Sequence, residues 1–83
     1  MKVHLRYFAS LREALGTGSE SIDTQAETLA ALRTELAARG GAYAQALAPG
    51  RAVRVALNQT MSDETAALSE GAEVGFFPPV TGG

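Results

Sequence analysis

Hydrophobic and polar residues alternate over three short stretches of this chain. In residues 2–8, Val3, Leu5 and Tyr7 fall on one face, and polar residues fall between them. A period of two is the pattern of a β-strand with one buried face, so this stretch is predicted to be a strand. Residues 51–57 and 73–77 show related patterns and are predicted to be strands as well. Weaker signals predict short strands at residues 19–23 and around Thr60-Met61.

One segment between these strands has helical periodicity. Within residues 28–39, leucines recur at positions 29, 32 and 36 and form one stripe, which predicts an amphipathic helix. Arg33, Glu35 and Arg39 fall off this stripe and are expected on its polar side. Thr28 is suited to cap the helix, because its hydroxyl can accept from a free backbone N–H of the first turn.

Two shorter segments are also predicted to be helical. Residues 10–15 read as a helical turn, with Ser10 as its N-cap and Gly16 as its end, and residues 43–47 add another turn. The order of elements predicts an α+β fold, with a mixed sheet and one main helix packed on one face, in which the first and last strands can lie side by side. We expect a domain at residues 1–77 and a flexible tail at residues 78–83.

Composition narrows the classes of function. The chain has 83 residues and a formal charge of −2, and its basic residues form no stripe, so a nucleic-acid partner is not expected. No apolar run approaches the roughly 20 residues that span a bilayer, and the first residues do not form a signal peptide. We therefore expect a cytoplasmic protein with no membrane partner. Cysteine is absent, which excludes disulfides and thiolate chemistry on side chains.

The side chains offer no familiar catalytic or metal-binding pattern. His4 is the only histidine and has no nucleophile motif near it, so it is interpreted as a bystander. The loop carboxylates lack the spacing of a metal site, and the glycine-rich turns lack the lysine and hydroxyl of a phosphate loop. We expect no metal and no cofactor bound by this chain.

The end of the printed sequence is its most distinctive feature. Phe76-Phe77-Pro78-Pro79-Val80-Thr81 precede Gly82 and Gly83. Two glycines give a slender backbone, and the α-carboxylate of Gly83 is ionised at neutral pH. Such a carboxylate can attack the α-phosphate of ATP, but another enzyme must supply the nucleotide site. The six residues after Phe77 reach about 20 Å when extended, which is enough to enter a partner's pocket.

Strand parity adds a docking surface beside the tail. If Val74 and Phe76 face inward, Gly75 and Phe77 face outward, and Phe8 faces outward at the end of the first strand. With the first and last strands adjacent, Phe8 and Phe77 would form one apolar patch. The alternative is that one or both rings belong to the core.

These residues resemble a known family. The ending from Phe76 to Gly83, together with Leu57-Asn58-Gln59-Thr60 and Phe8-Ala9-Ser10-Leu11-Arg12-Glu13, is similar to the small, sulfur-carrying subunits of molybdopterin synthase. The resemblance covers essentially the whole chain and implies a β-grasp, ubiquitin-like fold.

The resemblance also implies a function, that of a sulfur carrier. In this role the chain would not be an enzyme by itself. An E1-like enzyme would adenylate Gly83 with ATP, and a sulfur donor would convert it to a thiocarboxylate. The tail, with Val80, Thr81 and Gly82, would then enter the large synthase subunit, which supplies the catalytic side chains, and deliver sulfur to cyclic pyranopterin monophosphate. The two subunits are expected to form a heterotetramer, with Phe8, Arg12, Phe77 and Pro78 at the interface.

Three other functions remain open from the sequence. The chain can be a ubiquitin-like sulfur carrier for thiamine or for thiolated tRNA, a ubiquitin-like protein modifier, or an interaction module with an inert tail. The sequence Phe-Phe-Pro-Pro-Val-Thr favours the molybdopterin synthase family over the first. Lys2 is the only lysine, which makes polymeric chains of a modifier hard to build.

Overall fold

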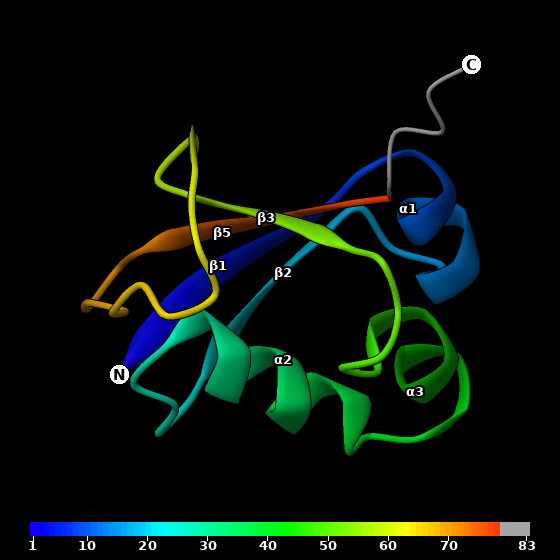
Figure 1. Ribbon diagram of the computed structural model, residues 1–83, viewed down its shortest axis with the longest axis horizontal. Helices are drawn as coiled ribbons and strands as arrows, with labels where there is room; N and C mark the ends of the chain where they lie inside the picture. Colours follow the sequence, from blue (N-terminus) through cyan, green and yellow to red (C-terminus); the bar gives the residue numbers. More distant parts are fainter. Residues whose placement is uncertain (79–83) are drawn as a thin grey trace.

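Residues 1–78 are described by the computed structural model, and they form a five-stranded sheet with α2 and α3 on one of its faces (Figure 1). In chain order the elements are β1 (Lys2–Tyr7), α1 (Ala9–Leu15), β2 (Ser19–Asp23), α2 (Leu29–Ala37), α3 (Gly41–Leu47), β3 (Arg54–Leu57), β4 (Thr60–Met61) and β5 (Glu73–Phe77). The predicted long helix is therefore confirmed as α2. The hydroxyl of Thr28 accepts from the backbone N–H of Ala31 at 3.1 Å, which confirms the predicted cap.

The sheet places the first and last strands next to each other. Its order is β2-β1-β5-β3-β4, so β5 lies at the centre. β1 and β5 are parallel, with Tyr7 in register with Phe76, whereas β2, β3 and β4 each run antiparallel to their neighbours. This mixed sheet with helices on one face confirms the predicted α+β, β-grasp class. It also brings the ends of β1 and β5 to the same edge of the molecule.

The core lies between the sheet and the helices. Val3, Leu5 and Tyr7 are buried on the inner face of β1, as their alternation predicts. The leucine stripe of α2 packs against them and is fully buried. Phe76 stacks on Tyr7 with ring centroids 5.8 Å apart, so the two parallel strands are also joined through their inner side chains.

Within residues 1–78, no helix covers the other face of the sheet (Figure 1). The outward residues of β1 are Lys2, His4 and Arg6, and all three are exposed. Parallel pairing sets Arg6 beside Gly75, and antiparallel pairing sets Arg54 beside Phe77 on the other side of β5. We call this helix-free surface the open face.

Several predicted element boundaries are wrong: the helix predicted over residues 28–39 covers Leu29–Ala37, and the one predicted over residues 43–47 already begins at Gly41. Ser10 is not an N-cap, because α1 begins at Ala9 directly after Phe8, whose backbone N–H still donates to Phe76 O at 3.1 Å. The strand predicted over residues 51–57 pairs only from Arg54. Its partner, β5, ends at Phe77 opposite Arg54, so within residues 1–78 the segment 51–53 has no strand to pair with.

Arg33 was expected on the polar side of its helix and is instead buried, with 3% of its surface exposed. Carbonyl oxygens and a carboxylate accept hydrogen bonds from its guanidinium, as described below. A buried cation is tolerated only with such partners.

Candidate functional site

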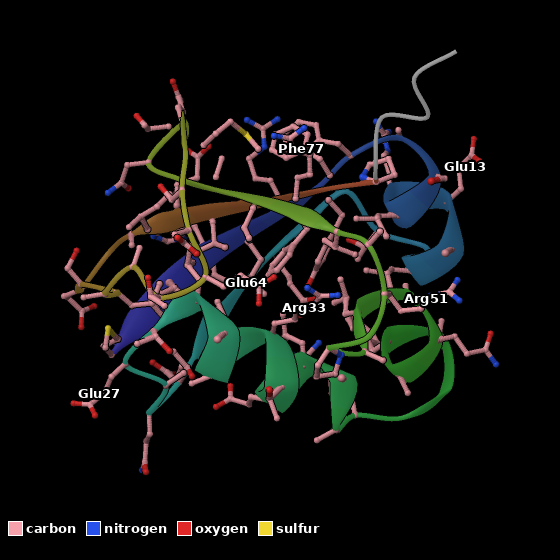
Figure 2. The ribbon with its side chains drawn as sticks, viewed as in Figure 1. Glu13, Glu27, Arg33, Arg51, Glu64 and Phe77 are labelled. Atoms are coloured by element: carbon pink, nitrogen blue, oxygen red, sulfur yellow. The ribbon has the colours of Figure 1, made fainter. Side chains whose placement is uncertain are left out.

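Phe8 and Phe77 form a parallel stack on the open face. Their ring centroids are 4.4 Å apart and the ring planes differ by 2°. Phe77 is the last residue of β5, and Phe8 follows the last residue of β1, so the parallel pairing of these strands sets the rings together. Figure 2 shows Phe77 on the side of the sheet away from α2. Both residues are half-buried, which leaves part of the apolar stack free for a partner.

Gly75 forms the floor beneath this stack. A Cβ built at Gly75 would lie 3.2 Å from a ring carbon of Phe77 and 3.2 Å from one of Phe8. Contacts this short push neighbouring atoms apart, so only glycine lets both rings lie flat on the strand. The signal for this role was present in the sequence, because a glycine in the middle of a strand often marks a close approach.

Two arginines lie beside the stack. The guanidinium carbon of Arg6 is 5.3 Å from the centroid of the Phe8 ring, a cation–π distance. Arg54 is in register with Phe77 on the neighbouring strand, and it is exposed. Among residues 1–78, the ion pairs observed use other arginines, namely Arg33 and Arg39.

Pro78 lies by a different surface from the ring stack. It lines a groove of about 750 Å³, together with residues of α1, α3 and the segment 50–53. Ser10, Leu11 and Ala14 are the α1 residues of this groove. The groove therefore begins where the described chain ends.

Arg12 points elsewhere. Its side chain packs on Gly18, where a Cβ would lie 3.3 Å from Arg12 Nε. The structure thus brings together two of the four predicted interface residues, Phe8 and Phe77, whereas Pro78, which follows Phe77, lines the groove. It does not place Arg12 in the stack.

One wall of the groove is held by Arg33. Its Nε donates to Leu47 O at 2.8 Å, and its Nη2 donates to Ala48 O at 2.7 Å and to Arg51 O. Nη1 forms an ion pair with Glu64 at 2.6 Å. Figure 2 shows the three labelled side chains of Arg33, Glu64 and Arg51 in this part of the molecule. One side chain therefore fixes the loop from α3 to β3, a role that its position off the leucine stripe did not indicate.

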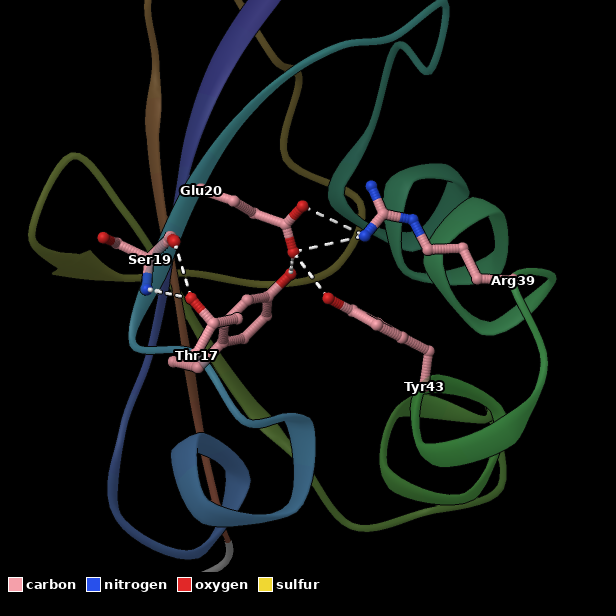
Figure 3. A network of polar contacts seen from close by, with 6 residues as sticks. Thr17, Ser19, Glu20, Arg39 and Tyr43 are labelled. Atoms are coloured by element: carbon pink, nitrogen blue, oxygen red, sulfur yellow. Dashed lines mark hydrogen bonds and ion pairs between the residues drawn. The ribbon is translucent and has the colours of Figure 1, made fainter.

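A second polar network ties the helices to the sheet, at Glu20 (Figure 3). Glu20 accepts hydrogen bonds from Tyr7 at 2.9 Å and from Tyr43 at 2.8 Å, and pairs with Arg39 at 3.0 Å. Partial burial would raise the pKa of Glu20, but the hydrogen bonds from Tyr43, Arg39 and Tyr7 together hold that pKa below its usual value.

The two tyrosines respond in the opposite sense. Burial raises the pKa of Tyr7 and of Tyr43, and the hydrogen bond that each phenol donates to Glu20 is the second cause. At neutral pH the network is therefore one carboxylate held by protonated phenols and a guanidinium. This arrangement stabilises the fold and leaves Glu20 without a free proton to exchange.

The predicted tail residues lie outside the part of the chain that the structure describes. Val80, Thr81, Gly82 and Gly83 lie beyond residue 78, so their predicted roles stay predictions. Among residues 1–78, no group of three or more metal-ligating side chains was found. In the same range, no helix has the length and apolar character needed to cross a bilayer.

Comparison with known proteins decides the family. The model of the ThiS family matches residues 5–83 of this chain. The chain belongs to the ThiS family. This ThiS-family chain is 40% identical over 81 residues to the molybdopterin synthase sulfur carrier subunit of Escherichia coli, with 98% of this chain and 99% of the relative covered. The corresponding subunit of Haemophilus influenzae is 38% identical, with the same coverage.

A solved complex extends the comparison to partners. The complex of subunits 1 and 2 of molybdopterin-converting factor from Helicobacter pylori contains a chain 26% identical to this ThiS-family chain, with a TM-score of 0.70 and 100% of both chains covered. The resemblance to sulfur-carrying subunits inferred from the tail is confirmed at the level of the family.

Proposed function

We propose that this chain is the sulfur carrier subunit of molybdopterin synthase. The observation that carries the proposal is the similarity to two such subunits over 98% of the chain. The family match runs from residue 5 to residue 83 and so includes Phe8, Phe77 and Gly83. The geometry supports it, since an apolar stack lies on the open face at the end of the strand that leads into the tail.

The proposed chemistry takes place at the carboxylate of Gly83. A carboxylate is a poor electrophile, so it first attacks the α-phosphorus of ATP in an E1-like partner, and pyrophosphate leaves. Sulfur at the oxidation level of sulfide, supplied by a donor, then attacks the acyl carbon of the adenylate, AMP leaves, and a thiocarboxylate forms. Gly82 and Gly83 have no side chains, which allows the backbone to pass a narrow channel.

The large synthase subunit is the proposed site of sulfur transfer. The Phe8–Phe77 stack binds its surface, and the residues from Pro78 onward, Val80 and Thr81 among them, enter its active site. There the sulfur of Gly83 attacks a carbon of cyclic pyranopterin monophosphate, and a carbon–oxygen bond at that carbon breaks. Water then hydrolyses the resulting thioester, which leaves the sulfur on the pterin and returns Gly83 to its carboxylate, and a second loaded chain delivers the second sulfur of the dithiolene in the same way. The Helicobacter pylori complex supports the pairing of a small with a large subunit. We propose a heterotetramer of two small and two large subunits.

Catalytic side chains are proposed to come from the large subunit. Two acid–base candidates among residues 1–78 have other partners: Glu20 is held by Tyr7 and Tyr43, and His4 Nδ1 lies 2.7 Å from Ser21 Oγ. The chain then acts as a co-substrate that is loaded, used and reloaded.

The test is the intact mass of the chain after incubation with an adenylating partner, ATP and a sulfur source. We expect the mass to rise by the difference between sulfur and oxygen. A matched variant with one alanine added after Gly83 keeps the fold and should not be loaded. An unchanged mass for the native chain, with a partner that loads a known carrier, would contradict the proposal.

A further inference from the structure

We propose that the open face binds a partner surface on which carboxylates surround an apolar recess, with Arg6 and Arg54 as the residues that recognise those carboxylates. The inference rests on the proposed function and adds the charge of the large subunit's docking surface. It identifies two contact residues that lie outside the predicted interface.

The first support is the position of the two guanidinium groups. Arg6 is in register with Gly75 from β1, and Arg54 is in register with Phe77 from β3. Since β5 lies between β1 and β3, the two arginines flank the strand that carries the stack. Neighbouring strands are about 4.8 Å apart, so both side chains lie within one interface patch of the rings.

The second support is that these charges are exposed beside apolar surface. Arg6 and Arg54 are exposed, and the ion pairs observed within residues 1–78 involve Arg33 and Arg39 instead. Two residues along β3 from Arg54, the buried Ala56 is in register with Met61, and Met61 has 51% of its surface exposed. Aromatic residues, methionine and arginine are the residue types that protein interfaces enrich.

The third support is the distribution of charge over the open face. At the start of β5, Glu73 is in register with His4 on β1. At the same end of the sheet, Lys2 on β1 is in register with Asp23 on β2, so charges of both signs lie there. At the end of β5, where the tail leaves, the outward charges are those of Arg6 and Arg54. The chain as a whole carries a formal charge of −2, so a positive end is a local feature. Complementary charge steers a partner into one orientation. Here that orientation sets the partner's carboxylates beside Arg6 and Arg54, at the root of the tail.

The arginines are suited to carboxylates in particular. The guanidinium of Arg6 lies over the Phe8 ring, and no hydrogen bond of its N–H groups is observed within residues 1–78. A planar guanidinium binds a carboxylate through two parallel hydrogen bonds, which a lysine cannot do. The stack and the arginine thus present an apolar surface with donors at its rim.

The experiment measures binding of the full chain to the large subunit of the same organism by titration calorimetry, at low and high salt. We expect Arg6→Glu and Arg54→Glu each to weaken binding about tenfold at low salt, with a smaller effect for Arg6→Gln and Arg54→Gln. The matched control is Lys2→Glu, which makes the same charge change at the far end of the same strand. Circular dichroism and melting curves check that each variant is folded.

The outcomes separate the two proposals. If the native chain binds, and the arginine reversals match Lys2→Glu at both salt concentrations, the inference about carboxylates is overturned while the proposed function stands. If the native chain does not bind the large subunit at all, the proposed function fails. Reversal variants that bind weakly at low salt, with Lys2→Glu unaffected, support the inference.

Discussion

The rings of Phe8 and Phe77 lie flat on each other over Gly75, 4.4 Å apart between centroids. The two residues are far apart in sequence and meet because β1 and β5 are parallel and adjacent. The stack is thereby fixed at the end of the sheet where β5 leads into the tail. Its geometry depends on the fold, and the proposed function depends on its geometry.

Replacing Phe77 with alanine should weaken binding to the large subunit more than it destabilises the fold. Burying a phenylalanine at an interface is worth roughly 1.5–3 kcal/mol, and Phe77 is only half-buried in the free chain. Calorimetric titration and urea unfolding measure the two losses. The control, Phe76→Ala, removes a fully buried ring and should cost about 3–5 kcal/mol of folding stability. A larger loss of stability than of binding in Phe77→Ala would place that ring in the core.

Gly75→Ala should separate the two rings while the sheet stays paired. The added methyl group would lie 3.2 Å from both, so we expect a loss of about 1–3 kcal/mol in stability, the usual cost of overpacking, and weaker binding. Ring proton chemical shifts report the stacking directly. Gly50→Ala is the matched control, since a Cβ there meets nothing within 4 Å. Equal effects of the two substitutions would show that the floor under the rings is not required.

Arg33→Met should be among the most destabilising substitutions in the chain. It leaves the Glu64 carboxylate and three carbonyl oxygens without their donor, and breaking a buried pair costs about 3–5 kcal/mol. Glu64 is partly exposed, so we expect the lower end of that range. Urea unfolding measures the loss, and Arg51→Met, at an exposed side chain, should change stability by no more than about 0.5 kcal/mol. A small effect of Arg33→Met would mean that the loop from α3 to β3 is held by other contacts.

The Glu20 network predicts a loss of stability in acid. The folded-state pKa of Glu20 lies below its ordinary value of 4.5, so the folded state binds fewer protons than the unfolded state near that pH. Its contribution is present above pH 4.5 and is lost as the pH falls through the folded pKa. Unfolding curves between pH 7 and pH 3 should therefore show a smaller pH dependence in Glu20→Gln than in the native chain.

Glu13→Gln provides the control for this pH series, because Glu13 is an exposed carboxylate on α1. That variant should keep the native pH dependence. At the alkaline end the sign reverses, since the pKa of Tyr7 is raised above its ordinary value of 10.0 and its contribution is lost as the pH rises above that value. If stability depends on pH in Glu20→Gln as it does in the native chain between pH 7 and pH 3, the Glu20 network does not contribute to stability through the ionised carboxylate.

Much of the site was predictable from strand parity. Alternation placed Val3, Leu5 and Tyr7 inward, and this forced Phe8 outward; the same rule applied to β5 placed Phe77 outward. For the two outward rings to meet, it was enough that β1 and β5 be adjacent strands. The stack was therefore within reach of sequence reasoning.

Arg33 was not predictable in the same way. Its place off the leucine stripe is typical of a solvated arginine, and nothing local indicates that Leu47 O, Ala48 O and Arg51 O converge on it. The partners come from a loop whose path depends on the packing of α3. The start of β3 was misjudged for a related reason, because the length of a strand depends on the length of its neighbour.

The most direct test of the central claim is a single-turnover reaction. The thiocarboxylated chain is mixed with the large subunit and cyclic pyranopterin monophosphate, without ATP or a sulfur donor, and both the pterin and the intact mass of the chain are followed. The account predicts that molybdopterin forms and that the chain returns to the mass of its carboxylate form. A thiocarboxylate that remains intact while the large subunit is active with a known carrier would contradict it.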